Sequence, residues 1–75
     1  MPPKPQEVVA MIQRSIPDAE VQAELFSGDN HFEVVVKSAS FAGKSRVAQH
    51  QMVYAALGEQ MKEAIHALAL KTLAL

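Results

Sequence analysis

Residues 21–37, VQAELFSGDNHFEVVVK, contain two strand-like segments joined by a short turn. Apolar and polar side chains alternate from residue 21 to 25, which is the period of a half-buried β-strand. Residues 32–36 are β-branched and almost continuously apolar, a pattern typical of a central strand. Because the Ser-Gly-Asp-Asn turn at 27–30 is short, we expect the two strands to be antiparallel neighbours.

Helical patterns lie on both sides of this hairpin. Apolar residues recur at helical spacing from Gln6 to Ile16, and Pro17-Asp18 ends that helix. A second helix is predicted from Arg46 to Leu57, with Ser45 as its N-cap and Gly58 at its end. One arc of about 120° on this helix is predicted to be its packing face. Its members are Val47, His50, Val53, Tyr54 and Leu57.

The remaining segments complete the predicted order α-β-β-α-α-β. Residues 38–45 form a loop, Glu59 to Ile65 a shorter helix, and alternation around Leu70 predicts a last strand. Two helices separate the second strand from the third, and this length suits a right-handed crossover between parallel strands. We therefore predict an α+β fold with a three-stranded mixed sheet and helices on one face. The other face is expected to be a solvated surface that carries Gln22, Glu24, Glu33, Lys37 and Lys71.

Length and composition restrict the function. The 75 residues predict one small domain at 6–75, preceded by a flexible tail at 1–5 that is rich in proline. Seven Lys and Arg against eight Asp and Glu is not the charge balance of a dedicated nucleic-acid binder. The chain has no cysteine, no long apolar run and no Ser/His/Asp or Cys/His catalytic set. We expect a cytoplasmic protein that is not an enzyme, with no catalytic residues and no membrane segment.

Two histidines stand at strand starts in this arrangement. His31 begins the second strand and His66 begins the third, so parallel pairing would bring both to one end of the sheet. Neighbouring strands lie about 4.8 Å apart, within reach of one metal or one shared partner. Strict alternation puts the two side chains on opposite faces, and two imidazoles do not complete a four-coordinate site. The alternative is that each histidine forms hydrogen bonds at its strand end.

The turn before the second helix carries two cations. Gly43-Lys44-Ser45 resembles the end of a phosphate-binding loop, but Ser38 stands where that motif needs a glycine. The Gly-x-x-Gly of nucleic-acid-binding KH domains is also absent, because Arg46 occupies its second position. Lys44 and Arg46 could attract a phosphate or an acidic partner at the helix N-terminus, or form an ordinary solvated turn. His50, in the apolar arc, is expected to be packed and hydrogen-bonded.

Taken together, several segments resemble the BolA family. Residues 41–47, FAGKSRV, followed by His50, Val53-Tyr54 and Leu57, are similar to its signature segment. Residues 28–34 and 65–68 are also similar to that family, and the loop at 27–32 is nearest to its bacterial IbaG branch. The resemblance covers roughly residues 7 to 72. It implies a class II KH-like fold, in agreement with the predicted order of elements.

The resemblance also implies a function. BolA-like proteins are adaptors that bind a monothiol glutaredoxin and share a [2Fe–2S] cluster with it and with glutathione, in iron–sulfur trafficking and iron regulation. On this chain His66 would be the first cluster ligand and His31 the second. The alternative is a KH-like nucleic-acid-binding regulator of transcription, stress response and cell morphology that uses Lys44 and Arg46. A third alternative is a homodimer formed through residues 73–75 or the edge of the last strand.

Overall fold

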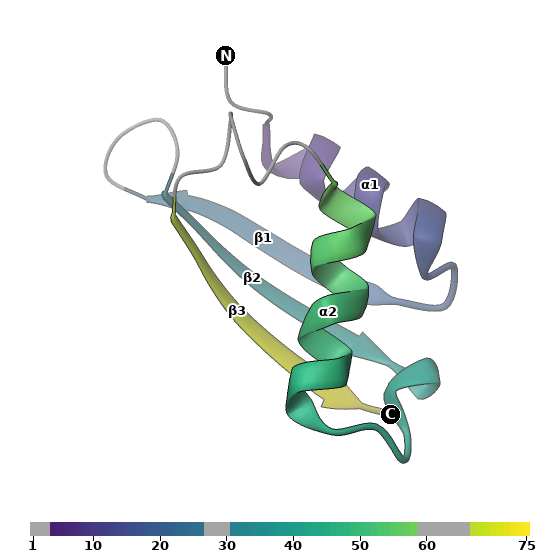
Figure 1. The fold of residues 1–75 in the computed structure, drawn as a ribbon. Helices are drawn as coiled ribbons and strands as arrows, with labels where there is room; N and C mark the ends of the chain where they lie inside the picture. The colour runs from purple at the N-terminus through teal and green to yellow at the C-terminus, as the bar shows by residue number, and fades with distance from the viewer. Residues whose placement is uncertain (1–3, 27–30, 59–66) are drawn as a thin grey trace.

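The computed structural model describes residues 4–26, 31–58 and 67–75, in which two helices cover one face of a three-stranded sheet (Figure 1). This arrangement confirms the predicted α+β fold. The predicted helix at 59–65 lies outside the described residues. The described elements are α1 (Pro5–Ser15), β1 (Glu20–Phe26), β2 (His31–Ser38), the 3-10 helix η1 (Ala39–Phe41), α2 (Arg46–Leu57) and β3 (Ala67–Ala74).

The sheet has the order β1-β2-β3, with β2 in the centre. β1 pairs with β2 in antiparallel register, with Glu24 opposite Glu33. β3 pairs with β2 in parallel register, with Ala67 opposite His31 and Ala74 opposite Ser38. Both predicted strand directions and the central position of the 32–36 segment are therefore confirmed.

Local hydrogen bonds explain where the helices begin and end. The Glu7 carboxylate accepts a hydrogen bond from the backbone N–H of Lys4, and α1 begins at Pro5, one residue before the predicted start. Ser45 caps α2 as predicted, because its Oγ accepts from the Ala48 N–H at 3.1 Å. Gly58 ends α2 with a φ of 56°, a conformation that glycine adopts without strain. Residues 1–3 of the predicted tail lie outside the described residues.

The core lies between the sheet and the two helices. Alternate residues of β2 point into it, which gives the strand one buried face and one polar face. On the opposite face of the sheet, the predicted solvated residues are exposed, except Lys37, which is half-buried. The buried apolar residues are Val8, Ile12, Ile16, Ala19, Phe32, Val34, Val36, Phe41, Val53 and Leu57.

The predicted packing face of α2 is partly wrong. Val53 and Leu57 are buried as expected, but Val47 is 66% exposed and Tyr54 is 39% exposed. The buried stripe is turned toward α1, and Met52 and Ala56 complete it. An arc drawn from hydrophobicity alone could not show this, because the orientation of α2 depends on elements distant in the sequence.

The predicted loop at 38–45 begins with the 3-10 helix η1. Ser38 caps it, because its Oγ accepts from the Ser40 N–H at 3.0 Å. The turn then passes through Gly43, whose φ of 77° is in the left-handed region. This segment leads the chain from the end of β2 to the start of α2, and it places Phe41 in the core.

Candidate functional site

The start of β2 meets the start of β3 at one end of the sheet. His31 is exposed, lies on the face away from the helices, and has Ala67 as its partner in the parallel register. Ala67 directly follows His66 in the sequence. The predicted convergence of these two chain segments is therefore confirmed at the level of the strands.

The position of the His31 ring relative to the His66 ring is not tested, because His66 lies outside the described residues. Its role as a ligand stays a prediction. Within 4–26, 31–58 and 67–75, no three histidine, aspartate or glutamate side chains are grouped to hold a metal ion. His31 is accessible to a ligand or partner from the open face of the sheet.

Lys44 and Arg46 lie at the opposite end of β3 from His31. Both are exposed beside the N-terminus of α2, and Arg46 is close to Leu73 near the end of β3. His31 instead pairs with Ala67, about five or six residues back along the strand, or roughly 17–20 Å at ~3.3 Å per residue. Figure 1 shows this separation between the start of β2 and the start of α2. The structure does not bring the two cations to the histidine end.

A hollow of about 360 Å³ lies between α2 and β3, and we call it the α2–β3 groove. His50 is half-buried in its wall, and its ring meets Tyr54 edge to face with centroids 6.2 Å apart. His50 is thus packed against an aromatic neighbour at the rim of the core. The groove is lined by Arg46, His50, Leu70, Lys71, Thr72 and Leu73.

Asp18 organises the turn that follows β2, although the sequence indicated only its part in ending α1. The Ser38 hydroxyl donates to its carboxylate at 2.9 Å, and the Ser40 hydroxyl and the Ala39 N–H donate at 3.0 Å each. The Ser38 hydrogen bond is the largest cause and lowers the pKa of Asp18; desolvation opposes it, and the hydrogen bonds of Ser40 and Ala39 add to the lowering. Three donors on one carboxylate hold the approach to α2 in place.

Gln49 joins three segments and was also missed by the sequence pattern. Its amide nitrogen donates to the carbonyls of Phe41 at 3.2 Å and Lys44 at 3.0 Å, and its oxygen accepts from the Thr72 hydroxyl at 2.7 Å. These bonds connect the cationic turn, α2 and β3. They also explain why a polar residue lies on the inner side of α2, a position that helical periodicity would assign to an apolar side chain.

Comparison with known proteins places this arrangement in a family. The sequence profile described as BolA-like protein matches residues 5–75. The Escherichia coli protein named DNA-binding transcriptional regulator BolA is 41% identical over 44 residues, or 59% of this chain and 42% of that protein. The match thus spans less than half of that regulator. Protein RP812 of Rickettsia prowazekii is 27% identical over 93% of this chain and 92% of its own length.

Solved structures agree with the sequence comparison. A BolA homologue from Coxiella burnetii superposes with a TM-score of 0.81 and 34% identity, over 96% of this chain and 91% of that one. The BolA domain of SufE1 from Arabidopsis thaliana has a TM-score of 0.80 at 22% identity, which shows the same fold. No described helix is long and apolar enough to cross a membrane. With the profile matching almost the whole chain and the fold shared along its length, this protein belongs to the BolA family.

Proposed function

We propose that this chain is a cytoplasmic, non-enzymatic adaptor that binds a monothiol glutaredoxin and contributes imidazole ligands to a shared [2Fe–2S] cluster. The observation that supports it best is the parallel register, which pairs His31 with the residue directly after His66. His31 thus lies opposite the first residue of β3, and that residue directly follows His66 in the sequence. Family membership supports the same role.

The donor chemistry fits this role. Imidazole is a regular ligand of iron in [2Fe–2S] centres, where it raises the reduction potential relative to an all-thiolate cluster. The chain has no cysteine, so the thiolates would come from glutaredoxin and glutathione. The absence of cysteine also suits the reducing cytoplasm. His31 and His66 would hold the exposed end of the sheet against the partner, and must be deprotonated to act as ligands.

Histidine variants test the ligand assignment. The chain is mixed with a monothiol glutaredoxin, glutathione, iron and sulfide, and the visible absorption spectrum is compared with that of glutaredoxin alone. We expect a distinct spectrum for the mixture, a loss of that difference in His66→Ala, and a weaker or shifted spectrum in His31→Ala.

His50→Ala is the matched control, because it removes an imidazole from α2 and leaves both strand starts intact. It should keep the spectrum of the unmodified chain. A spectrum that is unchanged in His66→Ala, or lost equally in His50→Ala, would show that the cluster ligands have been assigned to the wrong residues.

A nucleic-acid-binding regulator is the second candidate, and exposed cations favour it. The Escherichia coli relative is named as a DNA-binding transcriptional regulator. In this chain Lys44 and Arg46 are exposed beside the N-terminus of α2, where backbone N–H groups attract phosphates. Phosphate contacts of this kind give binding that weakens steeply as salt rises.

Gel shifts on mixed-sequence duplex DNA, at several salt concentrations, separate this candidate from the adaptor. A regulator should bind at low salt, and Lys44→Glu with Arg46→Glu should abolish the shift. Lys4→Glu with Arg14→Glu reverses the same number of charges on and next to α1 and should leave binding largely intact. The absence of any shift at low salt would remove this candidate.

A further inference from the structure

The outer edge of β3 is an unprotected strand edge. Among the described residues, β2 is the only strand that pairs with β3, which leaves the other side of an eight-residue strand unpaired. Such edges are usually blunted by charged residues, prolines or bulges. β3 reads ALALKTLA and carries one charge, at Lys71, whereas β1 at the other edge carries Glu20 and Glu24. This edge of the sheet is therefore suited to pairing with another strand.

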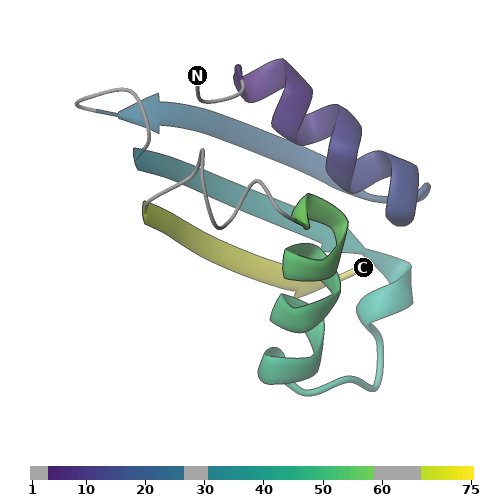
Figure 2. The ribbon, with the colours of Figure 1, turned by 45° about the horizontal axis from the view of Figure 1, so that its top comes forward.

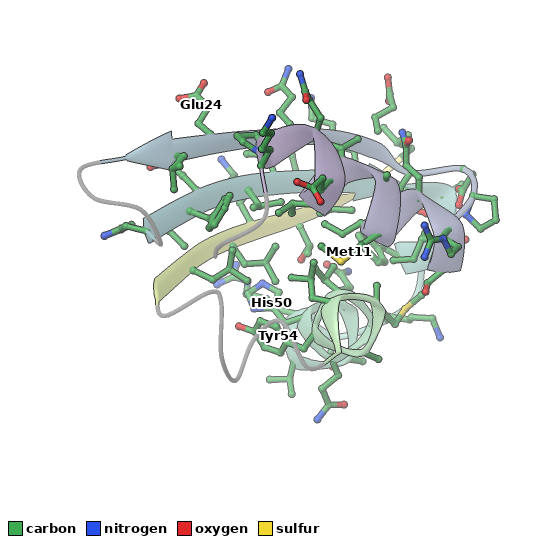
Figure 3. The ribbon with its side chains drawn as sticks, turned by 90° about the horizontal axis from the view of Figure 1, so that it is seen from above. Met11, Glu24, His50 and Tyr54 are labelled. Carbon is green, nitrogen blue, oxygen red and sulfur yellow. The ribbon has the colours of Figure 1, made fainter. Side chains whose placement is uncertain are left out.

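α2 is positioned to pack against one face of such an added strand. Its N-terminal part projects past β3, beyond the edge of the sheet (Figure 2). His50 and Tyr54 lie on the flank of α2 away from Met11, which points toward the space between the helices (Figure 3). Val47 is 66% exposed, and Leu73 at the end of β3 is 42% exposed. A fourth strand beside β3 would bury these apolar groups and fill the α2–β3 groove.

The charges around the groove indicate what kind of strand would bind. Arg46 and Lys71 line it, Lys44 lies in the preceding turn, and residues 39–58 and 67–75 contain no Asp or Glu. A second copy of β3 is disfavoured, because antiparallel pairing about the middle of the strand would bring two Lys71 residues together. Among the described acidic residues, Glu7, Glu20, Glu24 and Glu33 lie elsewhere, and the Asp18 carboxylate is already bonded to Ser38, Ala39 and Ser40 on the β2 side of β3.

We propose that the outer edge of β3 binds an extended peptide of alternating acidic and apolar residues, which adds a fourth strand to the sheet. Backbone hydrogen bonds to β3 would supply affinity, and alternate side chains would supply specificity. The apolar residues would pack beneath α2 near Val47 and Tyr54. The carboxylates, on the other face of the added strand, would pair with Lys71, and Arg46 would add positive charge at the rim of the groove. The α2–β3 groove is at the end of β3 away from His31, so peptide binding there does not need the proposed cluster ligands.

A defined peptide tests the proposal. The probe is a capped peptide of alternating Glu and Val, just long enough to pair with residues 70–74 of β3, titrated into isotope-labelled protein and followed by NMR. We expect shifts confined to β3 and α2, and slower exchange of the β3 amides that face outward. The matching peptide with Lys in place of Glu should not bind, and a version N-methylated along its length should bind far more weakly, because it cannot form the strand hydrogen bonds.

Charge reversal identifies the residues involved. Arg46→Glu with Lys71→Glu should weaken binding about tenfold, since the ion pair at Lys71 is lost and the charge around the groove is reversed. Lys4→Glu with Arg14→Glu is the control and should bind like the unmodified chain. The proposal is overturned if the Lys peptide binds equally well, if the shifts lie outside β3 and α2, or if nothing binds at millimolar peptide. Sedimentation of the protein alone should show a monomer; a dimer that pairs through β3 would also overturn it.

Discussion

Asp18 is the residue whose ionisation matters most for the turn after β2. Its carboxylate has two acceptor oxygens, and they receive both serine hydroxyls and the Ala39 N–H. Hydrogen bonds to the charged form lower the pKa of Asp18 below its ordinary value of 3.8. The folded chain therefore holds this carboxylate ionised more firmly than the unfolded chain does.

This difference predicts a pH dependence of stability. Because the folded-state pKa of Asp18 is lowered, its contribution is fully present above the unfolded pKa and is lost as pH falls through the folded pKa. Asp18→Asn keeps one acceptor oxygen but adds an N–H₂ group opposite these donors. We expect it to lower the thermal midpoint at pH 6, and the difference from the unmodified chain to shrink below about pH 3.8.

Glu20→Gln is the control for this experiment, because it removes a negative charge from an exposed side chain two residues away. Its thermal midpoint should stay close to that of the unmodified chain. A deficit in Asp18→Asn that persists unchanged at pH 2.5 would mean that size or shape, and not ionisation, is what the turn requires.

At the scale of elements, the position of α2 is set by the capping residues at its two ends and by the hydrogen bonds of one polar side chain, Gln49. Ser45 and Gly58 define where the helix begins and ends, and both were visible as capping signals. Gln49 holds the helix against the turn and against Thr72 of β3. The position of the groove therefore depends on a hydrogen-bonded contact as well as on apolar packing.

Replacing Gln49 with alanine is expected to lower the free energy of unfolding by about 1–3 kcal/mol, since partly buried hydrogen-bonding groups would lose their partners. Chemical denaturation measures this change directly. Gln51→Ala, at an exposed position of the same helix, should change stability by less than about 0.5 kcal/mol. Equal effects of the two substitutions would show that helix propensity, and not the contact with β3, governs this site.

At the scale of the whole molecule, the proposed cluster-binding residues and the cationic residues lie at opposite ends of β3. One end carries His31 and the residue that follows His66, and the other carries Arg46, Lys71 and the α2–β3 groove. A domain of this size buries only about 60% of its unfolded surface, so much of each element remains exposed. Two separate binding surfaces on one small sheet are therefore physically compatible.

Much of this arrangement could be predicted from the amino-acid sequence. The alternation at 21–25, the apolar run at 32–36 and the caps at Ser45 and Gly58 all correspond to observed elements. The parallel direction of β3 also followed, because the length of the connection restricts how the chain can return to the sheet. These features depend on local periodicity, short-range hydrogen bonds and chain connectivity, which a single sequence records.

The tertiary structure alone decided which side of α2 is buried, how Asp18 reaches Ser38, and that Arg46 lies far from His31. Each of these depends on the angle and depth at which elements pack, and that is set by contacts between residues that are distant in the sequence. Hydrophobic periodicity describes one element at a time. It therefore indicated the right helix but assigned Val47 and Tyr54 to the core, when packing left both exposed at the edge of the sheet.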